Sequence, residues 1–130
     1  MKIEHVALWT KNLDRLKSFY ETYFQAQANE KYVNPKTKFE SYFLIFPAGG
    51  PRLELMCKPD VMQCFNKPEN LIIGLVHIAF AVGSQEAVDV LTARLANDGF
   101  RVVSQPRRTG DGYYESCVLD PDGNQIEITM

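Results

Sequence analysis

The stretch His5-Val6-Ala7-Leu8 returns in the second half of the chain as His77-Ile78-Ala79-Phe80, and together these stretches hold both histidines of the 130-residue sequence. A glutamate inside an apolar segment follows each histidine at almost equal spacing, Glu54 in the first half and Glu127 in the second. The repeat predicts a duplicated module that brings one imidazole and one carboxylate per copy. Such a pair in each copy predicts a metal site where the copies meet.

The pattern around the first histidine predicts strand, helix and three further strands. Apolar residues alternate at the start of the chain, and Asn12 then precedes residues with helical spacing, as a helix N-cap does. Pro47-Ala48-Gly49-Gly50-Pro51 is a strong turn signal between two later segments. The expected elements are a strand over 2–9, a helix over 13–25, and strands near 27–33, 39–46 and 51–57.

The second half repeats this order. Ser84 is a second N-cap candidate, the helix after it is expected to end at Asp98-Gly99, and Asp120-Pro121-Asp122-Gly123-Asn124 predicts a hairpin turn. The expected buried stripe of this helix is Ala87, Val88, Leu91, Leu95 and Ala96. The expected strands are 75–82, near 100–104, 113–119 and 124–129.

The two halves predict a single α+β domain over residues 1–130. Module one covers 1–57, a linker with Pro59, Pro68 and Gly74 covers 58–74, and module two covers 75–130. Two tandem βαβββ modules are expected to form a cupped mixed sheet with the helices outside. Because side chains alternate along a strand, His5, Ala7 and Trp9 share one face, which is expected to be the inner one.

The composition is that of an ordinary globular protein. The apolar fraction is 45%, the charged fraction is 23% and the formal net charge is −2. This balance predicts neither nucleic-acid nor membrane binding. The N-terminus lacks a signal-peptide core and no apolar run reaches transmembrane length, so we expect a cytoplasmic protein.

The cysteines Cys57, Cys64 and Cys117 are odd in number and match no metal-knuckle spacing. They are expected to be reduced thiols that act as small apolar residues. Cys57 lies three residues after Glu54 and therefore on the other face of the same strand, so a ligand role for it is not expected.

The four residues His5, Glu54, His77 and Glu127 also permit a simpler interpretation. Each histidine could be a packed core residue, and each glutamate could lie on a solvent-exposed sheet face. The matching positions in a repeat favour the metal interpretation. Two imidazoles and two carboxylates leave positions open on a six-coordinate ion, as a catalytic metal requires.

The chain resembles the vicinal oxygen chelate superfamily, and in ligand pattern its glyoxalase I branch. The His-hydrophobic-Ala starts, the paired βαβββ modules and the ending Asp120–Ile128 carry this resemblance over nearly the whole chain. It implies that His5, Glu54, His77 and Glu127 ligate one divalent ion, zinc or nickel first, then cobalt, manganese or iron. Dioxygenases and fosfomycin-resistance transferases of the superfamily lack the fourth-strand carboxylate, and methylmalonyl-CoA epimerases have glutamine where Glu54 stands.

The resemblance also implies a function. A lyase or isomerase of this branch acts on a small hydroxycarbonyl or hemithioacetal through a metal-stabilised enediolate, with Glu127 as the catalytic proton shuttle and Glu54 as its alternative or partner. A dioxygenase, a thiol transferase or a non-enzymatic small-molecule or drug-binding protein are the alternatives. The resemblance and the open sheet edges of so small a chain also imply a homodimer.

Two positions depart from the glyoxalase I pattern. Trp9 stands where bacterial enzymes of the branch have an arginine that helps to bind glutathione, and Lys58 stands where they tend to have an asparagine. These departures argue against glutathione as the thiol, and Trp9 is expected to give a more apolar pocket floor or to pack in the core. Arg107 and Arg108, expected in a loop, are candidate anion contacts, and either Tyr113 or Tyr114 is expected to face the inner surface.

Overall fold

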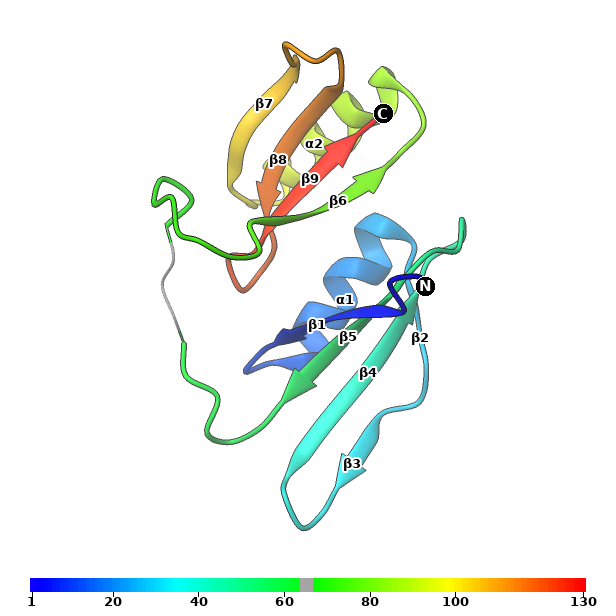
Figure 1. Cartoon of the computed structure of the whole chain (residues 1–130), viewed down its shortest axis with the longest axis vertical. Helices are drawn as coiled ribbons and strands as arrows, with labels where there is room; N and C mark the ends of the chain where they lie inside the picture. Colours follow the sequence, from blue (N-terminus) through cyan, green and yellow to red (C-terminus); the bar gives the residue numbers. More distant parts are fainter. Residues whose placement is uncertain (64–66) are drawn as a thin grey trace. The chain divides into compact units, whose positions relative to one another are not determined.

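The computed structural model describes residues 1–63 and 67–130. The chain divides into two compact units, Met1–Cys64 and Phe65–Met130, and the division falls within the expected linker 58–74. Each unit is an α+β module with one mixed sheet and one helix, so the tandem arrangement predicted from the repeat is confirmed (Figure 1). Cys64 lies outside the described residues.

The first module follows the predicted order closely. Asn12 caps its helix: the Asn12 side chain accepts a hydrogen bond from the backbone N–H of Arg15, and the left-handed backbone of Gln25 ends the helix. The elements are β1 (His5–Trp9), α1 (Leu13–Phe24), β2 (Gln27–Ala28), β3 (Tyr32–Asn34), β4 (Phe39–Ile45) and β5 (Arg52–Cys57).

The second module has one strand fewer among its described residues. The Ser84 hydroxyl accepts a hydrogen bond from the backbone N–H of Ala87, as predicted, and the helix stops before Asp98 and Gly99. The elements are β6 (His77–Ala81), α2 (Gln85–Asn97), β7 (Val102–Arg108), β8 (Tyr114–Leu119) and β9 (Gln125–Thr129). Neither helix of the described chain is long and apolar enough to cross a bilayer.

In both modules the first strand pairs in parallel with the last one. The strand order is β1-β5-β4-β2, with β3 also on β4, in one sheet and β6-β9-β8-β7 in the other. The crossover between parallel neighbours contains the helix, and α1 and α2 each pack against one face of their own sheet (Figure 1). The other face of each sheet is left to the residues that alternate with the core.

The cores lie between each helix and its sheet. In the strands Leu53 and Leu55 face α1, while Ile126 and Ile128 face α2, and all four are buried. The apolar helix stripes are largely as predicted, with one correction: Ala96 is exposed and Thr92 is buried in α2. Thr92 is tolerated there because its hydroxyl donates to the Val88 carbonyl and is hydrogen-bonded to the Ser116 hydroxyl, at 2.6 Å each.

Most strands are shorter than predicted by one to three residues, with β1 beginning at His5 and β6 at His77, and two strands differ in more than their ends. The expected strand 27–33 is interrupted and forms β2 and β3, which pair with opposite ends of β4. The expected strand 100–104 extends to Arg108 in β7, and the predicted loop position of Arg107 and Arg108 is therefore wrong. Pro106 is accommodated because β7 ends the strand order, and its pairing with β8 is irregular between Ser104 and Arg107.

The turn before β9 is organised by one buried carboxylate. Asp120 is 4% exposed. Its Oδ1 accepts hydrogen bonds from the backbone N–H groups of Asp122 and Asn124, and its Oδ2 accepts one from the Asn124 side chain, at 2.8–2.9 Å. This network fixes the turn that sets the register of β9, and therefore the position of Glu127.

The replacement Asp120→Ala should destabilise the protein by about 3 kcal/mol, because it removes the buried, charged acceptor of three hydrogen bonds and leaves their part-buried donors unpaired. Urea unfolding followed by circular dichroism measures this loss. The exposed Asp60→Ala is the control and should change the free energy of unfolding by less than about 0.5 kcal/mol. Equal stability of the two variants would show that the Asp120 network contributes nothing.

Candidate functional site

The first histidine and first glutamate meet on the sheet face that lies opposite α1. Ala7 in β1 is the register partner of Glu54 in β5, and His5 lies two residues before Ala7 on the same face. His5 Nε2 is 3.8 Å from Glu54 Oε2. The Glu54 side chain is only 14% exposed, so the alternative of a fully solvated glutamate does not hold here.

The second pair has the same construction. Ala79 in β6 is the register partner of Glu127 in β9, and His77 lies two residues before it. His77 Nε2 is 3.4 Å from Glu127 Oε2, and the Glu127 side chain is 20% exposed. The repeat therefore extends from sequence spacing to strand register and to the atoms that face each other.

The alanines explain why each carboxylate is accessible from its histidine. Ala7 and Ala79 are the direct neighbours of Glu54 and Glu127 across the parallel strand pairs. A larger side chain at either position would fill the space beside the carboxylate. The small alanines therefore leave room beside both carboxylates.

The structure brings the four residues together as two pairs. Among residues 1–63 and 67–130, His, Cys, Asp and Glu side chains form no group of three or more that could hold a metal ion. What the geometry establishes is one imidazole–carboxylate pair on the helix-free face of each sheet.

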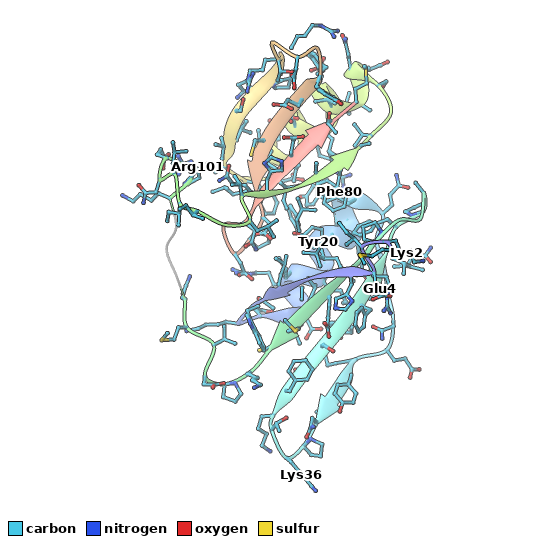
Figure 2. All side chains as sticks on the ribbon, viewed as in Figure 1. Lys2, Glu4, Tyr20, Lys36, Phe80 and Arg101 are labelled. Atoms are coloured by element: carbon cyan, nitrogen blue, oxygen red, sulfur yellow. The ribbon has the colours of Figure 1, made fainter. Side chains whose placement is uncertain are left out.

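Glu4 orients the first histidine, a role that the sequence pattern does not predict. Glu4 Oε2 lies 2.5 Å from His5 Nδ1, and Glu4 Oε1 lies 2.5 Å from Arg52 Nη2. Figure 2 labels Glu4 beside β1. The hydrogen bond with His5, assisted by Arg52, holds the pKa of Glu4 below its usual range. With Nδ1 engaged by an anion, Nε2 is the nitrogen that faces Glu54.

Two aromatic contacts complete this half of the site. The His5 ring meets Phe43 edge to face at 5.5 Å, and the Arg52 guanidinium lies 4.1 Å from the centre of the same ring. Phe43 is the register partner of Glu54 in β4. Alternation along β5 would have placed Arg52 on the face of Glu54. Alternation along the expected strand 2–9 puts Glu4 on the face opposite His5, whereas the observed β1 begins only at His5.

The second half has different neighbours around the same pair. Val76 precedes His77 where Glu4 precedes His5, and Cys117 is the partner of Glu127 where Phe43 is the partner of Glu54. Burial, together with the nearby charge of Glu127, raises the pKa of the Cys117 thiol to about 11. Cys117 is therefore a neutral thiol beside Glu127, as its expected role of a small apolar residue requires.

The two arginines lie on opposite faces of β7. Arg107 Nη2 is 3.5 Å from Glu115 Oε1. Ser116, the next residue along β8, faces α2, so Glu115 lies on the helix-free face. Arg107, its register partner in β7, therefore lies on the same face as His77. Arg108 stacks 5.9 Å from the ring centre of Tyr114. Tyr114 donates a hydrogen bond to Asp89 of α2, so both of these residues lie on the helix face.

Tyr113 precedes Tyr114, so the alternation of side chains places it on the helix-free face of the sheet. It precedes β8 and is 59% exposed. Of the two tyrosines, Tyr113 is the one consistent with an inner position.

The two residues that depart from the glyoxalase I pattern contact each other. Trp9 is 48% exposed, which excludes ordinary core packing, and the Lys58 ammonium lies 5.9 Å from the centre of its ring. Cys57 lies on the opposite face, where it pairs with Glu40. Burial, with the charge of Glu40, raises the pKa of the Cys57 thiol, so this residue is no better placed as a ligand than the sequence predicted.

Comparisons with known proteins agree with this fold. A family model described as "Glyoxalase/Bleomycin resistance protein/Dioxygenase superfamily" matches residues 2–128. An uncharacterized protein of Bacillus subtilis (strain 168), YqjT, is 27% identical over 134 residues, which cover 97% of this chain and 96% of the relative.

Solved structures of the same fold cover the whole chain. A glyoxylase/bleomycin resistance protein/dioxygenase domain from Frankia sp. EAN1pec matches with a TM-score of 0.81 at 20% identity, covering 100% of this chain and 97% of that one. The trypanothione-dependent glyoxalase I of Leishmania major matches with a TM-score of 0.75 at 23% identity, covering 99% and 86%. Taken with the family model, the duplicated module and its paired strands, these matches place the chain in the glyoxalase/bleomycin resistance/dioxygenase superfamily.

Proposed function

We propose that this protein is a metal-dependent lyase or isomerase of the glyoxalase I type that acts on a small hydroxycarbonyl or hemithioacetal substrate. One observation carries the proposal. Both modules place a histidine Nε2 and a glutamate Oε2 within 3.8 Å of each other, in the same strand register and on the helix-free face. A structural core or a solvated face does not require this duplication.

The donor atoms fit a divalent ion. Nitrogen and oxygen ligands that each lie about 2.1 Å from one ion are about 3.0–3.4 Å apart. The 3.4 Å between His77 Nε2 and Glu127 Oε2 lies within this range. The 3.8 Å between His5 Nε2 and Glu54 Oε2 would reach it after a small side-chain rotation. We assign all four residues as ligands of one ion, zinc or nickel first, with cobalt, manganese and iron as further candidates.

When bound, the ion would stabilise negative charge that develops on the substrate oxygens. The chain itself must move a proton between two adjacent carbons. Glu127 is the proposed base: its carboxylate takes the proton from the hydroxyl-bearing carbon next to the carbonyl and returns it to the carbonyl carbon, while the hydroxyl proton passes to the former carbonyl oxygen, so that the carbonyl and hydroxyl groups exchange places. Glu54 is the alternative or the partner for the opposite face of the substrate. The small Ala79 beside Glu127 leaves room for that approach.

We also propose that the chain works as a homodimer. β1 and β6 stand at the ends of their strand orders, and an open strand edge is a surface that proteins normally cover. Sedimentation equilibrium tests this, and a monomer at micromolar concentration would reject it.

The test of the function combines metal analysis with an assay of methylglyoxal hemithioacetals formed from several thiols. We expect close to one divalent ion per proposed site, removable by chelator, and isomerase activity that returns with metal. Activity only with dioxygen and Fe(II), or Mn(II)-dependent conjugation, would replace this proposal by the other enzyme classes of the superfamily. Ligand binding without stoichiometric metal would identify a non-enzymatic binding protein.

The replacement Glu4→Gln should weaken metal affinity by about 10- to 100-fold, because a carboxylate that orients a ligating histidine contributes that much. Competition with a fluorescent chelator measures the change. Glu30→Gln, an exposed glutamate of the same module, is the control and should have no effect. Unchanged affinity in Glu4→Gln would show that the contact with His5 Nδ1 does not support metal binding.

A further inference from the structure

An aromatic surface lies beside the first histidine–glutamate pair. Trp9 lies two residues after Ala7 on the same face of β1, and it is the only tryptophan of the chain. Its ring meets Phe39 edge to face at 6.2 Å, and Phe39 in turn contacts Tyr32 at 6.2 Å. Trp9 and Tyr32 are both about half exposed, at 48% and 54%. Exposed aromatic rings of this kind offer a flat surface for stacking.

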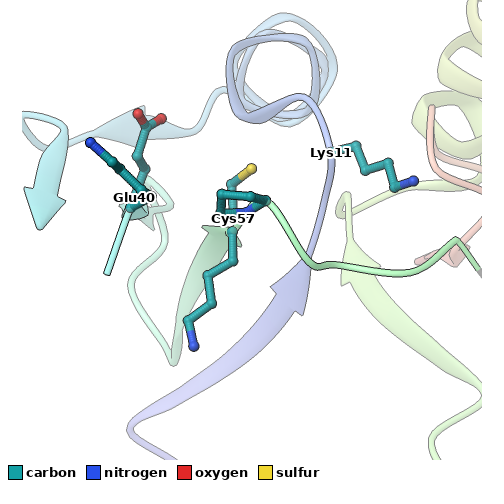
Figure 3. A pocket seen from close by; sticks show the side chains of 6 residues that line it. Lys11, Glu40 and Cys57 are labelled. Atoms are coloured by element: carbon teal, nitrogen blue, oxygen red, sulfur yellow. The ribbon is translucent and has the colours of Figure 1, made fainter. Parts of the chain in front are cut away.

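Lys58 brings positive charge to one end of this surface, beside a hollow that Glu40 and Cys57 of the helix face also line. Lys58, whose ammonium lies over the Trp9 ring, also lines a hollow of about 440 Å³ at the end of β5, together with Lys11 and Lys38. Figure 3 shows Lys11, Glu40 and Cys57 around this hollow. Glu40 is engaged by Lys31 at 3.8 Å, whereas none of the three lysines of the hollow has an ion pair within the described residues.

The charge and the rings together define a ligand. A substrate carboxylate would be attracted to Lys58, while an aromatic ring attached to that carboxylate would replace water on Trp9 and Phe39. The Lys58 side chain joins the two features, since it contacts the ring of Trp9 and lines the hollow. A ligand with an aromatic ring but no charge would form no ion pair with the lysines. A carboxylate without a ring would leave the Trp9 ring exposed to solvent.

We propose that Trp9, Phe39 and Lys58 form a subsite for a planar aromatic group that carries a carboxylate, and that this subsite sets the substrate class of the proposed enzyme. The inference rests on the proposed function for its role in catalysis, but the binding itself does not require metal or turnover. It accounts for both departures from the glyoxalase I pattern with one contact, because Trp9 and Lys58 are those two residues.

The lone tryptophan makes the subsite directly observable. The probe is 3-phenylpropanoate, compared with 3-cyclohexylpropanoate, which lacks the aromatic ring, and 3-phenylpropan-1-ol, which lacks the charge. We expect 3-phenylpropanoate to shift Trp9 emission to shorter wavelength with saturation and to bind more tightly than either comparison compound. Its affinity should fall as salt rises, because Lys58 is only partly buried and Lys11 and Lys38 are exposed.

Two variants separate the contributions. Lys58→Gln should weaken 3-phenylpropanoate binding about fivefold, because a charge pair at a partly buried lysine is worth about as much as the strongest surface pairs, and should leave the alcohol unaffected. Lys36→Gln, at the turn between β3 and β4 and labelled in Figure 2, is the matched control and should bind like the native chain. Trp9→Leu, followed by calorimetry, should lose the preference for the aromatic over the cyclohexyl acid.

The outcomes distinguish this inference from the proposed function. Metal content is measured in every preparation and should be the same in all variants. Equal binding of the acid and the alcohol, or equal binding by Lys58→Gln and the native chain, would overturn the subsite even if the protein isomerises hemithioacetals. Selective binding of 3-phenylpropanoate in a chain that holds no metal would support the subsite and reject the proposed enzyme.

Discussion

The replacement Glu127→Gln should lower kcat by about 1,000-fold while most of the metal is retained, because a positioned general base contributes 10²–10⁴-fold. Glutamine keeps the length of the side chain and an oxygen that can ligate, but it cannot take up a proton at the operating pH. The measurement pairs steady-state kinetics on the best hemithioacetal with metal analysis of the same sample. A loss in kcat without a matching loss of metal is the expected signature.

Glu115→Gln is the matched control for this experiment. Glu115 lies on the same face of the sheet as Glu127, on the adjacent strand β8, and its carboxylate faces Arg107 rather than His77. We expect it to keep kcat within about twofold of the native value, because the Glu115 carboxylate pairs with Arg107 and has no part in the proposed proton transfer. Equal activity of Glu127→Gln and native protein would move the base role to Glu54, which Glu54→Gln then tests.

The elements of this fold could be predicted where local chemistry decides them. Asn12 and Ser84 cap their helices, because the side-chain oxygen of each accepts a hydrogen bond from a backbone N–H group. This capping preference can be recognised from the residue type alone. The end of β7 could not be predicted in the same way. Pro106 stops a strand inside a sheet, but β7 has its second edge open, and only the sheet order reveals that.

The residues of the site were likewise predictable only where the local sequence pattern determines them. His5 with Glu54 and His77 with Glu127 could be paired from alternation and repetition alone, and the register confirms that Ala7 and Ala79 adjoin the two carboxylates. Glu4 could not be found because alternation along the expected strand 2–9 puts it on the face opposite His5, whereas β1 begins only at His5. The contact between Trp9 and Lys58 was also hidden, since it joins the ends of two strands that are distant in the sequence.

The largest effect on metal should come from the histidines. His77→Ala should weaken metal affinity by more than about 100-fold, since loss of a ligand exceeds the loss caused by removing its outer hydrogen-bond partner. His5→Ala should do the same, because the two pairs have the same register and the same atoms facing each other. Metal content after dialysis against a weak chelator, with circular dichroism to verify the fold, measures both.

Val76→Ala is the control for His77→Ala, because it removes side-chain atoms from the adjacent exposed residue and leaves the imidazole in place. Full metal content in either histidine variant would reject the four-ligand centre, whereas loss in only one would reduce it to the pair in that module. The two variants also report how a site is assembled. If one site takes its pairs from different chains, refolding an equal mixture of His5→Ala and His77→Ala restores metal to a fraction of the sites. If both pairs come from one chain, the mixture stays empty, since every chain then lacks one imidazole.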